Sequence, residues 1–191
     1  MRKIFKLLPM LLALLLLLGG CTGADGRGSG SKKSDAMPNT VLITVKDYGQ
    51  IKVVLFPEQA PLTVSNFKGL VYKGHYDGLV FHRIIEGFMI QGGAGKKVPT
   101  IKGEFAENGF ENPIKHQRGT ISMARTNDMN SATDQFFICQ APYDYGNGKY
   151  AAFGQVVEGM TVVDRIAAVA TSYNDRPLSD VVIESIVFVE E

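Results

Sequence analysis

The chain has 191 residues, of which 45% are hydrophobic and 20% are charged. This length and composition predict one globular domain with a buried core and exclude two full-sized domains. The formal net charge is +1, so there is no basic excess to neutralise phosphates, and we expect no nucleic-acid partner. Two cysteines and three scattered histidines supply neither a disulfide framework nor a histidine-based metal cluster. We therefore expect no metal and no cofactor.

The first twenty residues have the pattern of a secretory signal peptide. Arg2, Lys3 and Lys6 give a positively charged start, and residues 7–18 form an apolar run interrupted only by Pro9. As a helix, twelve residues rise about 18 Å, well short of the roughly 30 Å hydrocarbon core of a bilayer. A membrane-spanning helix is therefore disfavoured, and this segment is predicted to be a signal peptide.

The apolar run ends in Leu18-Gly19-Gly20-Cys21. This sequence resembles the lipobox of bacterial lipoproteins, in which a branched apolar residue and two small residues precede a cysteine. The resemblance implies a mature chain that begins at Cys21 with lipid on its sulfur and its amine, and several acyl chains anchor a protein stably. We then expect a lipid-anchored protein at the cell membrane, with its domain on the extracytoplasmic side. An ordinary signal peptide followed by a chance cysteine is the alternative.

Residues 21–38 are predicted to be a flexible tether. The segment is rich in glycine and serine, and it contains no apolar residue larger than Met37. Such a stretch cannot offset the entropy of its own ordering. As a flexible coil, the seventeen residues after Cys21 would span about 20–25 Å root-mean-square. The folded domain is expected from residue 39 to residue 191.

The pattern of this domain is mainly β. The expected strands are 41–45, 51–56, 79–85, 88–91, 120–124, 135–139, 151–156 and 182–189, and the expected helices are 61–74 and 160–169. Many short strands with two separate helices favour a closed β-barrel or a sandwich whose ends are covered by helices. Residues 93–116 are expected to form a long loop, and long loops in compact domains often carry function.

The sequence lacks the signatures of covalent catalysis and of phosphate binding. The residues around Gly95-Lys96 do not fit a phosphate-binding loop, and no Gly-x-Ser-x-Gly motif occurs. Cys139 lies in an apolar run, which predicts a buried and inert thiol. His82 lies in an expected strand, where a packed, hydrogen-bonded histidine is favoured over a general base.

Four ordered segments of the central region resemble the signature sequences of the cyclophilin family of peptidyl-prolyl isomerases. They are residues 81–93 (FHRIIEGFMIQGG), 122–125 (SMAR), 135–139 (QFFIC) and 153–156 (FGQV). The match is collinear from about residue 40 to the C-terminus. The resemblance implies a closed eight-stranded antiparallel β-barrel capped by two α-helices, and peptidyl-prolyl cis-trans isomerase activity without a cofactor.

The resemblance also implies which residues act. Arg83 and Gln91 are the implied catalytic residues, and Arg83 is the donor to the prolyl nitrogen. Gln91 and the backbone around Ala124 and Arg125 would hold the peptide groups of the substrate. Gln135 would support Arg83 from behind. The implied substrate-binding residues are Phe88, Met89, Ala124, Arg125, Gln135, Phe137, Tyr145 and Tyr150.

Simpler roles remain open for single residues. Any one of the phenylalanines or methionines could be plain core packing, and Arg83 could form a surface ion pair with Glu86 or Glu107. Two tyrosines depart from many animal members of the family. Tyr145 stands in the place of a tryptophan, and Tyr150 replaces a pocket histidine while keeping an aromatic wall with a polar tip.

The expected function is peptidyl-prolyl isomerisation that accelerates the folding of exported proteins at Xaa–Pro bonds. The expected partners are proline-containing exported polypeptides and, through the lipid anchor, the membrane, and we expect a monomer. The alternative is a proline-binding chaperone or surface adhesin in which catalysis is incidental. The intact set of implied site residues favours the enzyme, because a pure binding module does not need an aimed donor such as Arg83.

The lipobox resemblance generates a first prediction. Cys21→Ser removes the thiol that would carry the lipid, so we expect this variant to be unprocessed or to be shed from the membrane. Fractionation of cells, with the mass of the recovered chain, measures both effects. Maturation and membrane association equal to those of the wild type would exclude lipidation at Cys21.

Overall fold

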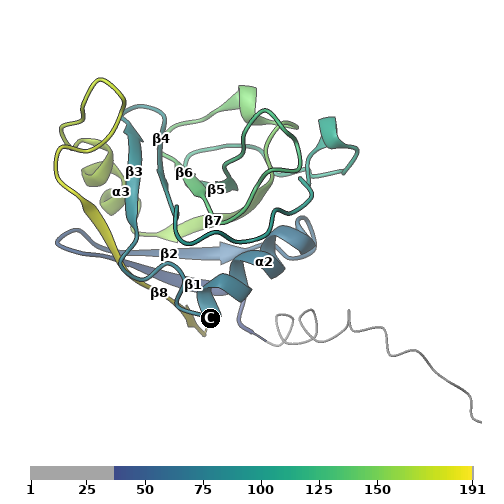
Figure 1. Ribbon diagram of the computed structural model, residues 1–191, viewed down its shortest axis with the longest axis horizontal. Coiled ribbons are helices and arrows are strands. Elements are labelled where there is room, and N and C mark those ends of the chain that lie inside the picture. The colour runs from purple at the N-terminus through teal and green to yellow at the C-terminus, as the bar shows by residue number, and fades with distance from the viewer. Residues whose placement is uncertain (1–36, 191) are drawn as a thin grey trace, which may run out of the picture.

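The computed structural model describes residues 37–190. The expected signal peptide, Cys21 and the tether up to residue 36 lie outside the described residues. Eight antiparallel strands close into a barrel in the order β1-β2-β7-β5-β6-β4-β3-β8 (Figure 1). The strands are β1 (Thr40–Val45), β2 (Gly49–Leu55), β3 (Val80–Ile85), β4 (Met89–Gly92), β5 (Thr120–Met123), β6 (Phe136–Cys139), β7 (Ala152–Glu158) and β8 (Val181–Val189).

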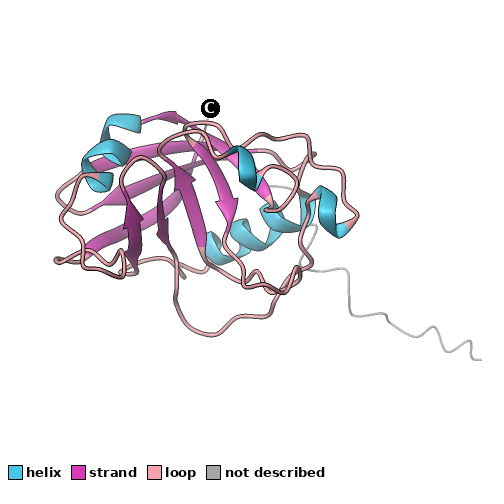
Figure 2. Ribbon diagram, turned by 90° about the horizontal axis from the view of Figure 1, so that it is seen from above, coloured by secondary structure: helices cyan, strands magenta, loops and turns pink. Residues whose placement is uncertain are grey.

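Within residues 37–190, two α-helices, α2 (Pro61–Tyr72) and α3 (Met160–Ala167), lie near opposite ends of the barrel (Figures 1 and 2). Two short 3-10 helices, η1 (Ala106–Asn108) and η2 (Asp144–Gly146), interrupt the long loops. The expected barrel with two helices is therefore confirmed, and the sandwich alternative is excluded. Among the described residues, no helix combines the length and the apolar character needed to cross a membrane.

Several boundaries differ from those expected. β2 begins at Gly49, because Gly49 already pairs with Val45 across the β1–β2 hairpin. β7 continues to Glu158, which pairs with Lys52 of β2 both in the backbone register and by a 3.2 Å ion pair. The start of β2 and the end of β7 are thus set by pairing with neighbouring strands, which the local hydrophobic pattern of the sequence does not reveal.

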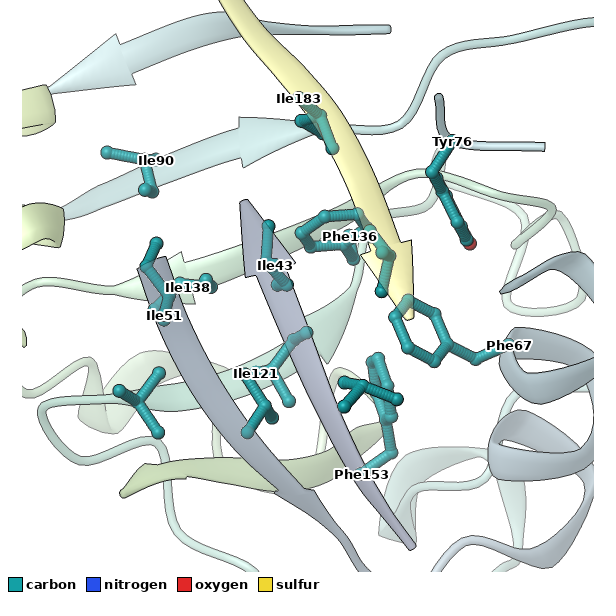
Figure 3. Packing of buried hydrophobic residues seen from close by; sticks show 14 of the residues in the cluster. Ile43, Ile51, Phe67, Tyr76, Ile90, Ile121, Phe136, Ile138, Phe153 and Ile183 are labelled. Atoms are coloured by element: carbon teal, nitrogen blue, oxygen red, sulfur yellow. The ribbon is translucent and has the colours of Figure 1, made fainter. Parts of the chain in front are cut away.

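The barrel interior is filled by fully buried aliphatic side chains, among them Ile43, Ile51, Ile90, Ile121 and Ile138 (Figure 3). Alternation along each strand points these residues inward and their neighbours outward. The interior is therefore a packed core, and any binding site must lie outside it.

The helix α2 closes one end of the barrel with an aromatic side chain. The Phe67 ring lies 5.7 Å from Phe136 in an edge-to-face arrangement and 5.1 Å from Phe153 (Figure 3). Glu104, from the long loop expected at 93–116, accepts hydrogen bonds from the Leu62 and Thr63 amides at the start of α2, at 2.9 and 2.8 Å. This carboxylate replaces a local N-cap, since no side chain of the helix caps it. The long loop is thus tied to the helix.

Candidate active site

A second apolar cluster lies on the outer face of the barrel, apart from the core. Its buried members are Met89, Phe137 and Cys139, and its partly buried members are Ile85, Phe88, Ala124, Tyr143 and Tyr150. They come from β3, β4, β6, the turn between β3 and β4, and the loops that follow β5 and β6. An apolar cluster on the outside of a filled barrel is a candidate binding surface.

Strand register aligns three of the expected site residues. Arg83 of β3 pairs with Gln91 of β4, and Gln91 pairs with Phe137 of β6. Directly opposed residues of antiparallel strands are about 4.5–5.5 Å apart, with their side chains on one face. The three side chains therefore stand in one row across adjacent strands.

A β-bulge in β3 turns Arg83 to this outer face. The register shifts between Phe81 and Arg83, so His82 is the extra residue. Phe81 and Ile84 are each 1% exposed in the core, whereas regular alternation would place Phe81 and Arg83 on the same side. The Nδ1 atom of His82 is buried without a hydrogen-bond partner among residues 37–190, and burial lowers the pKa of His82. The bulge thus re-aims the arginine, as bulges next to functional sites often do.

These residues enclose a cavity of about 260 Å³. It is lined by Arg83, Phe88, Met89, Gln91, Ala124, Arg125, Phe137, Tyr143 and Tyr150. Its floor and walls are apolar and aromatic, and two guanidinium groups lie at its polar side. Such a cavity suits a small apolar ring that is attached to polar peptide groups.

Aromatic contacts fix the walls of the cavity. Phe137 and Tyr150 meet at 90° with centroids 5.8 Å apart, and Phe88 and Tyr143 lie 4.7 Å apart. Burial, followed by the neighbouring Tyr150, raises the pKa of Tyr143 to about 12. Burial likewise raises the pKa of Cys139 to about 12, which agrees with an inert thiol.

A buried histidine supports the wall from behind. His116 is fully buried, and its ring stacks on Phe137 at 5.9 Å and 15°. Its Nε2 lies 3.0 Å from the Ser122 Oγ, and its Nδ1 lies 3.3 Å from the Asn147 Oδ1. Burial lowers the pKa of His116, so the ring is neutral at neutral pH.

The guanidinium groups of Arg125 and Arg83 differ in how many of their N–H donors are already hydrogen-bonded within the protein. Arg125 donates from Nε and Nη2 to the Lys149 carbonyl, at 3.0 and 2.8 Å, and from Nη1 to the Thr126 carbonyl at 2.8 Å. It also lies over the Tyr150 ring, 4.7 Å from the centroid. Arg83 donates from Nε to the Asp175 Oδ2 at 3.3 Å. Within the described part of the chain, neither Nη atom of Arg83 makes a hydrogen bond.

The polar groups beside the cavity are arranged differently from the expectation. Gln91 Nε2 donates to the Gln135 Oε1 at 3.0 Å, so Gln135 orients Gln91, and within residues 37–190 it makes no hydrogen bond to Arg83. Gln135 lines a neighbouring hollow of about 190 Å³. The Ala124 amide is already bonded to the Gln135 carbonyl at 2.9 Å, so this N–H is not free for a substrate.

Tyr145 lies outside the cavity. Its side chain is on η2, it is 66% exposed, and its ring is 6.0 Å from Tyr143. Tyr143 lines the cavity instead. Gly146, the residue after Tyr145, allows the Tyr143 ring to pack closely, because a Cβ at position 146 would lie 2.6 Å from the Tyr143 Cδ1. The structure thus places Tyr143, and not Tyr145, among the residues that line the cavity, and a role of Tyr145 in substrate binding stays a prediction.

Sequence reasoning missed Tyr143, His116 and Asp175. The aromatic cluster Tyr143-Asp144-Tyr145 was a usable signal for the first. His116 and Asp175 have no local signal, since each contacts the site across a long sequence separation. Arg83 pairs with Asp175 in place of Glu86 or Glu107, and Glu107 instead lies 4.0 Å from Lys149.

The buried His116 predicts a pH-dependent stability. Its pKa in the folded state lies below the unfolded value of about 6.5, so the unfolded chain binds the extra proton. The contribution is complete above about pH 6.5 and is lost as the pH falls, by at most about 1.4 kcal/mol per pH unit. We expect the difference in unfolding free energy between the wild type and His116→Gln to shrink from pH 7.5 to 5.0. Urea unfolding at each pH measures it, and a constant difference would contradict the assignment.

Comparison with known proteins agrees with this geometry. A family profile described as "Cyclophilin type peptidyl-prolyl cis-trans isomerase/CLD" matches residues 40–188. Peptidyl-prolyl cis-trans isomerase B of Escherichia coli is 42% identical over 155 residues, which cover 73% of this chain and 94% of that protein. A peptidyl-prolyl cis-trans isomerase of Streptomyces antibioticus is 42% identical over 154 residues, with 72% and 91% covered.

A solved structure shows the same fold. The crystal structure of a cyclophilin type peptidyl-prolyl cis-trans isomerase from Cryptosporidium parvum superposes with a TM-score of 0.73 at 28% identity, and it covers 80% of this chain and 98% of the other. Together with the barrel, the outer apolar cavity and the row of Arg83, Gln91 and Phe137, these matches show that the chain belongs to the cyclophilin family and is a peptidyl-prolyl cis-trans isomerase that acts on proline-containing polypeptides.

Proposed function

We propose that Arg83 supplies the hydrogen-bond donor that stabilises the twisted Xaa–Pro amide. Rotation about an amide bond faces a barrier of about 18–20 kcal/mol, because resonance must be broken. As the C–N bond twists, the lone pair returns to the prolyl nitrogen. A fixed donor aimed at that nitrogen stabilises the transition state more than either planar ground state.

The observation that carries this proposal is the pair of free Nη groups of Arg83 at the edge of an apolar cavity. The second guanidinium, on Arg125, has donors already bonded to backbone carbonyls. Arg83 is permanently charged at physiological pH, and its planar fork presents donors in fixed directions. Of the two, it is therefore the group that can respond to a developing lone pair.

The rest of the cavity positions the substrate. The proline ring would occupy the apolar space between Phe88, Met89 and Phe137, with Tyr143 and Tyr150 as walls. Gln91, oriented by its hydrogen bond to Gln135, would hold a peptide group of the chain that carries the proline. No bond to the substrate forms or breaks in this mechanism.

The substrates that we propose are exported polypeptides. The support is in the sequence, where a charged start and an apolar run precede Leu18-Gly19-Gly20-Cys21. A lipidated Cys21 followed by a Gly/Ser tether would hold the isomerase domain at the outer side of the cell membrane, where exported chains fold. The Cys21→Ser fractionation described above tests this location.

Arg83→Ala tests the donor. If the guanidinium binds the prolyl nitrogen only as the bond twists, kcat falls by about 100- to 1000-fold, equivalent to about 2.7–4 kcal/mol, while the ground-state affinity for the peptide changes little. Arg83→Lys should recover little, because an ammonium on a flexible stem does not reproduce the fork. A protease-coupled assay of a Xaa–Pro peptide gives kcat, and titration calorimetry gives the affinity.

Phe137→Leu is the control for binding, since a smaller side chain at the cavity floor weakens the affinity. Circular dichroism checks that each variant is folded. Near-wild-type turnover of folded Arg83→Ala would show that the cavity works without this donor.

A further inference from the structure

We propose that Asp175 is a positioning residue for the isomerase reaction, which holds the Arg83 guanidinium so that its Nη groups face the cavity. This inference rests on the proposed role of Arg83 as the donor. Asp175 does not line the cavity, and it belongs to the loop between α3 and β8.

This loop is a tight, internally bonded turn. The Ser172 amide donates to the Arg176 carbonyl at 2.7 Å, and the Asp175 amide donates to the Ser172 carbonyl at 3.0 Å. Thr171 and Pro177 form a β-bridge at its base. Asp175 adopts a φ of +62°, a left-handed conformation that aspartate and asparagine tolerate better than most residues. The position of the carboxylate is thus set by a defined backbone geometry.

The turn is fixed to the strand that carries the arginine. β3 pairs with β8 only at Val80 and Phe81, and beyond these residues the loop runs beside β3 (Figure 1). There the Ile84 amide donates to the Asp175 carbonyl at 2.8 Å. Asp175 therefore satisfies a backbone donor next to Arg83 that β8 leaves free.

The carboxylate of the same residue then engages the side chain. Asp175 Oδ2 lies 3.3 Å from the Nε of Arg83, so it binds the inner edge of the guanidinium and leaves the Nη donors available. The Asp175 carbonyl thus binds β3 at Ile84, next to Arg83, and the Asp175 carboxylate binds the Arg83 side chain. Fixing a long arginine side chain in this way costs conformational entropy. Because this entropy is already lost in the free enzyme, it does not add to the activation free energy of the reaction.

Stability alone does not explain this ion pair. The two side chains are 42% and 40% exposed, and ion pairs at such exposure contribute little to the free energy of folding. The nearby pair of Arg176 and Asp180 is longer, at 3.8 Å, and is 65% exposed on both sides. The effect expected of Asp175 is therefore on turnover and not on folding.

The chain provides a matched control for the backbone conformation. Asp47, in the β1–β2 turn, is the other non-glycine residue with positive φ among residues 37–190, at +66°. Glycine adopts this conformation freely, so Asp175→Gly and Asp47→Gly each remove a carboxylate without backbone strain. Asp175→Asn keeps an acceptor oxygen and tolerates the same φ.

We expect Asp175→Gly to lower kcat by about 10- to 100-fold, with KM nearly unchanged, because the substrate cavity is intact. Asp175→Asn should recover most of the turnover, and Asp47→Gly should leave kcat and KM at wild-type values. The double variant Arg83→Ala/Asp175→Gly should be no slower than Arg83→Ala alone, because Asp175 affects turnover only through the Arg83 guanidinium, which the first substitution already removes.

Arginine side-chain relaxation by NMR tests the same claim on the wild-type protein, whether or not the variants fold. The Nε–H of Arg83 should be ordered like that of the bonded Arg125 and unlike that of the exposed Arg176. An Arg83 Nε–H as mobile as that of Arg176, or wild-type kcat in folded Asp175→Gly, would overturn the positioning role. If Asp175→Gly keeps wild-type kcat while Arg83→Ala is slow, only the positioning role fails. If Arg83→Ala itself retains wild-type kcat, the proposed mechanism fails.

Discussion

Closure of the barrel is the constraint on which the rest of the structure depends. Each of the eight strands is hydrogen-bonded on both sides, so no strand can shift its register without breaking two ladders. The side chains on the outer face therefore hold fixed relative positions, as the row of Arg83, Gln91 and Phe137 shows. The proposed mechanism needs such rigidity, because in it the donor is placed before the bond twists.

The division between the inner and outer apolar clusters follows from the same closure. Inward residues such as Ile90 and Ile138 fill the interior completely. Their outward neighbours Met89 and Phe137 are still apolar, and they are covered by the Tyr143 and Tyr150 loops instead of by a second layer. The cavity is the space that these loops leave over β4 and β6. The cavity offers an apolar space for a ring, and beside it lies the Arg83 guanidinium with its Nη donors free of hydrogen bonds to residues 37–190.

The sequence allowed much of this architecture to be predicted, for identifiable reasons. Alternation along strands and helical spacing in α2 and α3 depend on local residues, and the signature around Arg83 is contiguous in the chain. The bulge at His82 could not be predicted, because simple alternation from Phe81 would turn Arg83 inward. The contact of Asp175 with Arg83, 92 residues apart, depends on how the last loop folds back on β3. The family resemblance indicated Tyr145 and gave no sign of Tyr143, because the sequence does not tell which side chain at the start of η2 faces the cavity.

The central claim is that a donor on Arg83 binds the prolyl nitrogen in the transition state. Substrate peptides that carry 4-fluoroproline test it most directly, since fluorine withdraws electron density and weakens this nitrogen as an acceptor. Both fluorine diastereomers are needed, because they pucker the ring in opposite senses but share the inductive effect. The quantity to measure is the ratio of the enzymatic rate constant to the uncatalysed rate constant of the same peptide. We expect a lower ratio for both fluorinated peptides with the wild type and no such decrease with Arg83→Ala, whereas equal ratios for all peptides with the wild type would contradict a donor role for Arg83.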